Sequence, residues 1–252
     1  MNMKNIKRGW MLFGALACSI IGCGPPPAVS IPQAQKLEKK NIGRHKLSVD
    51  LPDVGKVLYT IEIPETYDGK KPVPLVLFLH YGYEGAKPAP HTGAGMIDLF
   101  ASGVNNHGAI ALAPDVQNGD WRSANNEKAA IWLVKSALET YNIDKDQIVV
   151  SGYSMGGEGA LFVGSRHQDL FAGALPMAAP VAGSKEWKIP VYFVHSDADQ
   201  VVSYAAAKSH AERIKSAGGE VHFESLKGLK HFDTHRYIGG FNNGLKWLAE
   251  KW

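Results

Sequence analysis

The chain has 252 residues, of which 45% are hydrophobic and 20% are charged. This length and composition predict one globular domain with a sizeable core. The formal net charge is +3, but three basic residues and no acidic residue lie in the first 22 positions, and the remainder carries 24 basic and 24 acidic residues. A neutral body without runs of like charge excludes the electrostatic footprint of a nucleic-acid-binding protein.

The N-terminus has the pattern of a secretion signal over residues 1–22. A basic stretch from Met1 to Gly9 precedes an apolar run from Trp10 to Ile21, and this run is too short to span a bilayer. The segment Ile20 to Cys23 resembles a bacterial lipobox, which implies that Cys23 is lipidated and becomes the first mature residue. The chain is therefore expected to be exported and attached to a membrane by a lipid.

Two alternatives to this anchor are open. Cys18 is a second lipidation candidate, but its apolar run would be shorter. Alternatively, Cys23 is a passenger in a plain signal peptide. In either case the cleaved product lacks two cysteines for an internal disulfide, so a secreted domain would depend on its core. In lipoproteins of this kind, a residue other than Asp after the cysteine, here Gly24, favours the outer membrane of a Gram-negative cell and hence the periplasm.

A Pro-rich and polar stretch over residues 23–43 has the composition of a semi-rigid tether. The folded domain is predicted over residues 44–252. From residue 57 onward, short apolar runs alternate with amphipathic stretches, which is typical of a parallel sheet covered by helices. The predicted strands are Val57 to Ile63, Pro74 to Leu79, Ala109 to Ala113, Gln147 to Ser151, Gly173 to Met177, Val191 to His195 and Val221 to Ser225.

Helices are predicted between these strands from apolar residues at helical spacing. They cover Asn125 to Tyr141, Gly157 to Ser165, Tyr204 to Ile214 and Phe241 to Trp252. The predicted fold class is α/β, with a mostly parallel central sheet and helices on both faces. No second domain is needed.

The strongest local motif is G-x-S-x-G over residues 152–156, with Ser154 at its centre. It directly follows a predicted strand and precedes a predicted helix, as a nucleophile elbow requires. The glycines are expected to avoid collisions at a sharp turn, which would lift the Ser154 hydroxyl above the sheet. The amides at the start of the following helix would favour developing negative charge there.

A serine hydroxyl needs an adjacent base and an orienting acid to act as a nucleophile near neutral pH. Two later patches supply two candidates for each role. Asp197 and Asp199 follow a predicted strand, and His231 and His235 follow the last strand. Asp197 is alternatively an N-cap of a helix beginning near residue 201. The chain order of serine, aspartate and histidine is that of the α/β-hydrolases.

Over residues 55–250 the sequence resembles α/β-hydrolases of the phospholipase/carboxylesterase, dienelactone hydrolase and polyhydroxybutyrate depolymerase or feruloyl esterase groups. Their acid usually lies in H-G-x-x-D-x-x-V, which this chain matches from His195 to Val202 with serine in place of glycine. Their histidine usually follows a glycine within three residues. The resemblance therefore favours Asp199 over Asp197 as the acid, and His231 over His235 as the base.

The same resemblance implies an oxyanion hole made by backbone amides. One is that of Met155, after the nucleophile, and the other lies on the loop after residue 79. Because the usual His-Gly pair is interrupted here by Tyr81, either Tyr81 or Gly82 is the second donor.

Three aromatic residues are candidates for lining a substrate cleft: Tyr83, Trp121 and Tyr153. A packed aromatic is the competing interpretation of Trp121. His80 and His195, at the ends of apolar strands, are expected to position loops and not to catalyse. The ten histidines show no metal-ligand spacing, so neither a metal nor a cofactor is predicted.

The predicted activity is hydrolysis of a carboxylic ester, from a small molecule or a polymer, through a Ser154 acyl-enzyme. Two alternatives stand beside it. One is an amide hydrolase like the prolyl oligopeptidase catalytic domain, although no propeller domain precedes the fold. The other is a tethered binding module without turnover, because a fold alone does not imply a function.

Overall fold

The structure is a computed structural model that describes residues 36–252. Its strands are β1 (Gly43–Leu51), β2 (Gly55–Ile63), β3 (Val73–Leu79), β4 (Ile110–Pro114), β5 (Ile143–Tyr153), β6 (Gly173–Met177), β7 (Val191–Ser196) and β8 (Val221–Leu226). The helices are α1 (Ala94–Asn106), α2 (Ala124–Thr140), α3 (Met155–Arg166), α4 (Tyr204–Ser216) and α5 (Ile238–Ala249), with a 3₁₀ turn η1 (Thr234–Tyr237) before α5.

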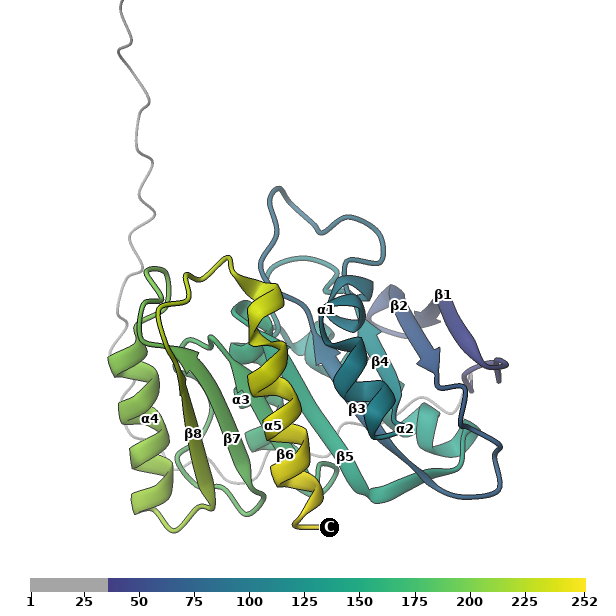
Figure 1. Ribbon diagram of the computed structural model, residues 1–252. Helices are drawn as coiled ribbons and strands as arrows, with labels where there is room; N and C mark the ends of the chain where they lie inside the picture. The colour runs from purple at the N-terminus through teal and green to yellow at the C-terminus, as the bar shows by residue number, and fades with distance from the viewer. Residues whose placement is uncertain (1–35) are drawn as a thin grey trace, which may run out of the picture.

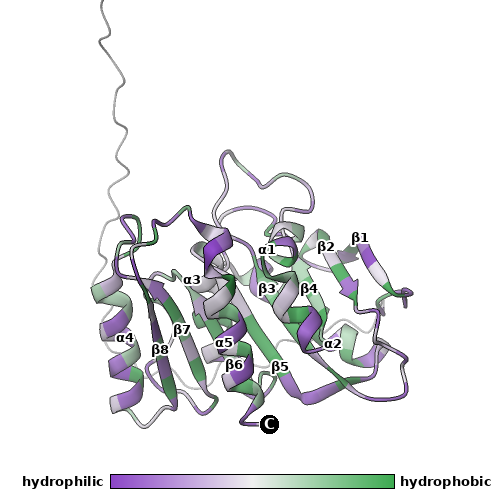
Figure 2. Ribbon diagram, viewed as in Figure 1, coloured by the Kyte–Doolittle hydropathy of each residue, from purple (hydrophilic) through white to green (hydrophobic). Residues whose placement is uncertain are grey.

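The strands form one eight-stranded sheet in the order β1-β2-β4-β3-β5-β6-β7-β8. The six strands β3 to β8 run parallel to one another, whereas β2 is antiparallel to both β1 and β4. Residues 75–79 of β3 and 110–113 of β4 are fully buried, because helices cover both faces of these strands. The hydrophobic centre of the sheet is visible in Figure 2, in contrast to the mixed surfaces of the helices.

Two layers of helices enclose the sheet (Figure 1). Helices α2, α3 and α4 contribute buried side chains to one core, and α1 and α5 contribute to the core on the opposite face. This confirms the predicted mostly parallel sheet with helices on both faces. All seven predicted strands and all four predicted helices are present, with β5 beginning four residues earlier than expected.

Strand β1 was absent from the sequence prediction, although it carries a usable pattern. Leu47, Val49 and Leu51 alternate with polar residues and face the core, as expected for a half-buried strand. Basic and polar residues dominate the first half of β1 and obscure this alternation. The strand pairs along its whole length with β2, from Gly43 opposite Ile63 to Leu51 opposite Gly55.

Helix α1 was also missed, and its sequence explains why. It contains Gly95 and Gly103, has no side-chain N-cap, and is kinked at Phe100, where φ is −120° and ψ is 16°. Each of these features weakens a helix prediction from local sequence. Tertiary packing stabilises it instead: a Cβ at Gly103 would lie 2.7 Å from the Phe241 ring of α5.

The predicted start of the domain at residue 44 is too far along the chain. Leu37 is only 6% exposed, and its carbonyl accepts a hydrogen bond from the hydroxyl of Thr140. The amide of Lys40 donates to the Tyr141 hydroxyl at 2.9 Å. Residues 36–42 therefore pack against the domain and are not part of a free tether.

The predictions of a signal peptide over residues 1–22 and of lipidation at Cys23 lie outside the described residues. Within residues 36–252, no helix has the length and apolar character needed to cross a membrane.

Three phenylalanines from separate elements join α1 and α5 to the sheet. The ring centroids of Phe100 and Phe241 lie 4.8 Å apart, and Phe78 of β3 lies 5.5 Å from Phe241. We expect Phe241→Ala to lower the free energy of unfolding by about 3 to 5 kcal/mol, because it leaves a cavity in a fully buried cluster. Chemical denaturation measures this change. Phe232→Ala is the matched control: this side chain is 77% exposed, so its loss should alter stability by about 0.5 kcal/mol or less.

Candidate active site

Ser154 lies at the sharp turn that joins β5 to α3. Its φ of 55° and ψ of −118° are unusual for a residue with a side chain and cost on the order of 1–3 kcal/mol. The turn is held by a hydrogen bond of 2.9 Å from the Ser154 amide to the carbonyl of Met177 at the end of β6. This is the geometry of a nucleophile elbow, which presents the serine hydroxyl at the carboxyl edge of the sheet.

Close backbone approach explains the glycines on either side of Ser154. A Cβ at Gly152 would lie 2.1 Å from the carbonyl oxygen of Gly156, and a Cβ at Gly156 would lie 1.8 Å from the carbonyl oxygen of Leu79. Since no side chain fits at such distances, the elbow requires glycine at both positions. This agrees with the steric role expected from the motif.

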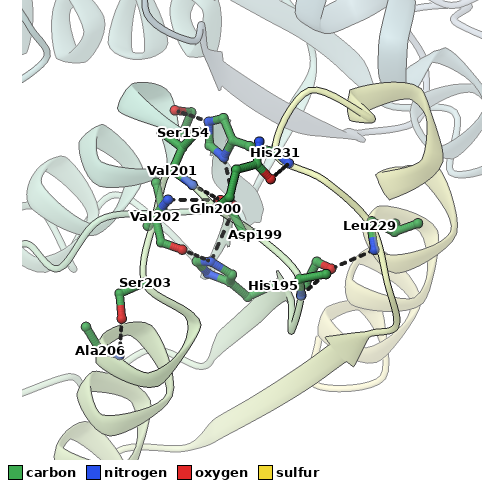
Figure 3. Close-up of polar contacts among 12 residues, drawn as sticks. Ser154, His195, Asp199, Gln200, Val201, Val202, Ser203, Ala206, Leu229 and His231 are labelled. Atoms are coloured by element: carbon green, nitrogen blue, oxygen red, sulfur yellow. Dashed lines mark hydrogen bonds and ion pairs between the residues drawn. The ribbon is translucent and has the colours of Figure 1, made fainter.

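The structure brings Ser154, His231 and Asp199 together (Figure 3). The Ser154 Oγ lies 2.9 Å from His231 Nε2, and His231 Nδ1 lies 2.8 Å from Asp199 Oδ2. The carboxylate therefore holds the proton on Nδ1 and leaves Nε2 free to accept the serine proton. In the chain, Ser154 lies 77 residues from His231, and Asp199 lies 32 residues from it.

The Asp199 side chain is fully buried and yet remains suited to the ionised form. Burial raises the pKa of its carboxyl, but hydrogen bonds from His231 and from the amides of Val202 and Val201 outweigh burial and leave the pKa below its usual value. The Val201 amide donates to Asp199 Oδ1 at 2.8 Å and the Val202 amide donates to the same atom at 2.9 Å. With Oδ2 occupied by His231, both carboxylate oxygens have partners.

The main chain of His231 is held from two sides. The Tyr153 hydroxyl donates to the His231 carbonyl at 2.6 Å, and the His231 amide donates to Gln200 Oε1 at 3.3 Å. Tyr153 directly precedes the nucleophile, and Gln200 directly follows the acid. The base is therefore positioned by the chain neighbours of its two partners.

The competing acid and base candidates have other environments. Asp197 accepts hydrogen bonds from the Gly228 amide and from Lys227 Nζ, so it joins two loops. It does not cap a helix, as one interpretation predicted, because α4 begins at Tyr204 and the side chain of Ser203 is its N-cap. His235 lies in η1. Ser154 and Asp199 both contact His231, so His235 takes no part in this series of contacts.

His80 positions the loop that is expected to supply the second oxyanion donor. Its Nδ1 donates to the Tyr81 carbonyl at 2.7 Å, and its Nε2 accepts from the Val116 amide at 3.1 Å. These partners define a neutral tautomer, and burial lowers the pKa of the ring in agreement with it. The His80 carbonyl accepts the indole N–H of Trp121 at 2.9 Å, which ties this loop to the loop after β4.

Met155 is the first residue of α3, where a helix amide has no partner within the helix. Among the described residues, the amides of Tyr81 and Gly82 donate no hydrogen bond. The carbonyl of Tyr81 faces the His80 ring, so the Gly82 N–H in the same peptide plane points away from that ring. Both Tyr81 and Gly82 stay candidates for the second donor.

Of the three candidate cleft residues, Trp121 and Tyr153 do not line a cleft, and the interpretation of Trp121 as a packed aromatic is confirmed. Trp121 and Tyr153 are each 1% exposed, because Trp121 packs against Gly159 of α3 and Tyr153 packs edge-on against Tyr237. Tyr83 is half-buried, and its hydroxyl donates to the Gly119 carbonyl at 3.0 Å. The rings of Trp121 and Tyr153 therefore support the site loops and present no surface to a ligand.

Gln200 and a cluster of ion pairs near the site were not predicted from the sequence. Gln200, which supports His231, has no recognisable motif. His195 was expected to position a loop, and its Nε2 lies 3.2 Å from the Val202 carbonyl and 3.5 Å from Asp199 Oδ2. An ion-pair cluster follows β4: Arg122 contacts Asp120 at 2.8 Å and Glu158 of α3 at 3.1 Å. Only proximity in the fold shows these pairings.

Comparison with known sequences identifies the family. The phospholipase/carboxylesterase family matches residues 110–245, more than half of the chain and the stretch that contains the three site residues. The chain belongs to this family. Acyl-protein thioesterase 1 homolog 1 of Dictyostelium discoideum is 30% identical over 114 residues, which cover 42% of this chain and 50% of that protein.

Cutinase est1 of Thermobifida alba is 28% identical, over 58% of this chain and 52% of the cutinase. The chain thus spans about half the length of these curated relatives. Among solved structures, a thermostable esterase superposes with a TM-score of 0.70 at 23% identity, over 82% of this chain and 62% of the esterase. This likeness confirms the predicted α/β-hydrolase fold.

The two aspartates allow a paired test of the acid. Asp199→Asn keeps the shape of the side chain but favours the wrong imidazole tautomer, and in the serine protease template such a change lowers kcat by about 10⁴. We expect a loss of this order in the rate at which a fluorophosphonate labels Ser154. Asp197→Asn should change that rate by less than about threefold, since its partners lie outside the Ser154–His231 contact.

The histidines form the second pair: His231→Ala should be almost unreactive and His235→Ala should react normally. Circular dichroism establishes that each variant is folded. If Asp197→Asn or His235→Ala were the severe member of its pair, the assignment of acid or base would be wrong.

Proposed function

We propose that the protein is a serine hydrolase of carboxylic esters that acts through a Ser154 acyl-enzyme. One observation carries this proposal: Ser154 Oγ, the His231 ring and the buried Asp199 carboxylate form an unbroken hydrogen-bonded series. Membership of the phospholipase/carboxylesterase family supports it. The relatives named as thioesterase and cutinase support an acyl group bound through sulfur or oxygen as the target.

In the first step His231 Nε2 takes the Ser154 proton while Oγ attacks the ester carbonyl carbon. The carbonyl oxygen becomes an oxyanion, which the amide of Met155 and that of Tyr81 or Gly82 stabilise. Removing one such donor typically costs about 2.7 to 4 kcal/mol of transition-state stabilisation. Asp199 stabilises the imidazolium that forms.

The tetrahedral intermediate then expels the alcohol, whose oxygen receives the proton from His231 Nε2. In the second half a water molecule loses a proton to His231 and attacks the acyl-enzyme carbonyl. Collapse releases the carboxylic acid and returns the proton to Ser154. The residues end as they began, so the net reaction is ester plus water giving acid plus alcohol.

A binding module without turnover is the competing proposal, and the physical cost of the site weighs against it. The strained backbone of Ser154 opposes folding, and the core does not need it. An amide hydrolase would use the same three residues, so a substrate panel must separate esters from amides.

Ser154→Ala tests the nucleophile directly. We expect the wild type to hydrolyse p-nitrophenyl acetate and to be labelled by a fluorophosphonate, because His231 activates the hydroxyl. Ser154→Ala should lose labelling and retain less than about 10⁻³ of kcat. The corresponding p-nitroanilides should be cleaved far more slowly than the esters. Undiminished labelling of Ser154→Ala would exclude this residue, and preferred cleavage of the anilides would favour an amidase.

We further propose that the domain is exported and held at a membrane by a lipid on Cys23. The supporting pattern is the basic start of the chain, the apolar run and the Ile20 to Cys23 segment. In a Gram-negative cell the domain would then reside in the periplasm or at the outer membrane.

The two cysteines provide matched variants for the anchor. Cys23→Ser should move the protein from the membrane fraction to the soluble fraction and stop incorporation of labelled fatty acid, since no thiol remains to be lipidated. Cys18→Ser should leave both unchanged. Fractionation with immunoblotting measures the distribution. Continued membrane partition of Cys23→Ser would contradict the lipid anchor.

A further inference from the structure

Two exposed hydrophobic side chains lie beside the candidate active site. In residues 36–252, four large hydrophobic residues are exposed, and two of them lie on the loops that carry Asp199 and His231 at the carboxyl edge of the sheet (Figure 1). They are Val201 after β7 and Phe232 after β8, exposed by 55% and 77%. Of the other two, Val181 lies between β6 and β7, where the chain runs along α3, and Ile42 precedes β1 at the opposite edge.

Two of these side chains are attached directly to the site. Phe232 follows His231, and its ring stands edge-on to the imidazole, with the centroids 5.3 Å apart and the planes at 88°. The Val201 amide donates to Asp199 Oδ1 at 2.8 Å, as Figure 3 shows, while its side chain stays in solvent. The bond from the His231 amide to Gln200 joins the two loops. The main chain that carries these apolar groups is therefore fixed by the contacts that assemble the site.

The direction of the reaction identifies which part of a substrate meets this surface. When Ser154 Oγ attacks, the carbonyl oxygen turns toward the amides after β3 and at the start of α3. The leaving oxygen must approach His231 Nε2, because that nitrogen returns the proton. The group carried by the leaving oxygen therefore emerges past the His231 ring, on the side of the loop that carries Phe232.

We propose that Phe232 and Val201 bind the apolar alcohol portion of the ester. This rests on the proposed ester hydrolysis and narrows its substrates to esters of long-chain or aromatic alcohols. The driving force is removal of the alcohol chain from water, worth up to about fourfold in binding for each methylene that is buried. Because hydrogen bonds already fix the main chain of both loops, little main-chain entropy is lost on binding.

The experiment compares two substrate series on the full chain. In the first, the acyl group is constant and the alcohol grows from ethyl acetate to hexyl acetate; in the second, the alcohol is constant and the acyl group grows from ethyl acetate to ethyl hexanoate. Acid release in a pH-stat gives kcat/KM. Phe232→Ala should lower the hexyl-to-ethyl preference of the first series by about tenfold, equivalent to losing the burial of nearly two methylenes. The acyl preference of the second series should stay within about twofold.

Two further variants make the result specific. Val201→Ala should weaken the alcohol preference in the same direction as Phe232→Ala, and it keeps the test available if the Phe232 variant misfolds. Ile42→Ala is the matched control, because it removes an equally exposed hydrophobic residue from the opposite edge and should change neither series.

Several outcomes would overturn the inference. A change confined to the acyl series, or no change in either series, would show that these side chains do not bind the alcohol. A change seen only with an insoluble polyester or with lipid vesicles would assign the surface to adsorption on an interface. If the wild type were labelled by a fluorophosphonate but hydrolysed no ester in either series, the proposed function would fail and the inference with it. Wild-type turnover with an unaltered Phe232 variant would overturn the inference alone.

Discussion

The contact between the nucleophile turn and the end of β3 is the constraint on which the rest of the site depends. Gly156 lies so close to the Leu79 carbonyl that any Cβ would collide with it. This closeness places the start of α3 directly beside the loop after β3. The segments that carry the proposed oxyanion donors, Met155 and Tyr81 or Gly82, are therefore neighbours in the fold.

A second constraint is electrostatic. The buried carboxylate of Asp199 would be costly without partners, and it is retained because two amides and one imidazole complete its hydrogen bonding. The amides come from the next residues of its own loop, so the loop conformation and the charge stabilise each other. Tyr153 and Gln200 then fix the His231 main chain from opposite sides. His231 is thus held by the chain neighbours of the other two site residues.

Much of this arrangement was predictable from the sequence because the responsible physics is local. Apolar runs such as residues 75–79 specify buried strands, and G-x-S-x-G specifies a turn that only glycine permits. The choice of Asp199 and His231 came from family resemblance, and the structure brings these two residues to Ser154. Asp197 would have satisfied local reasoning equally well. Its place between two loops depends on Gly228, 31 residues away.

The errors share a cause, because each concerns packing between distant segments. Helix α1 is stabilised by α5 and not by its own composition, while β1 and residues 36–42 pack on the sheet edge despite their polar sequences. Trp121 and Tyr153 were candidates for a cleft, with packing as the competing interpretation of Trp121, and both are buried. No local pattern indicates that the Trp121 indole donates a hydrogen bond to the His80 carbonyl. Nor does one indicate that the Tyr153 hydroxyl donates to the His231 carbonyl.

The parallel order of β5 to β8 links the fold to its chemistry. Parallel strands end at the same edge, so the loops after β5, β7 and β8 bring the proposed nucleophile, acid and base to one place although up to 77 residues separate them. The same rule brings Val201 and Phe232 to that edge. The hydrogen bonds that join these loops use the amides of Val201 and His231, so the outward side chains of Val201 and Phe232 take no part in them. Under the proposed function, substrate preference could therefore change at residues 201 and 232 while the contacts among Ser154, His231 and Asp199 are preserved.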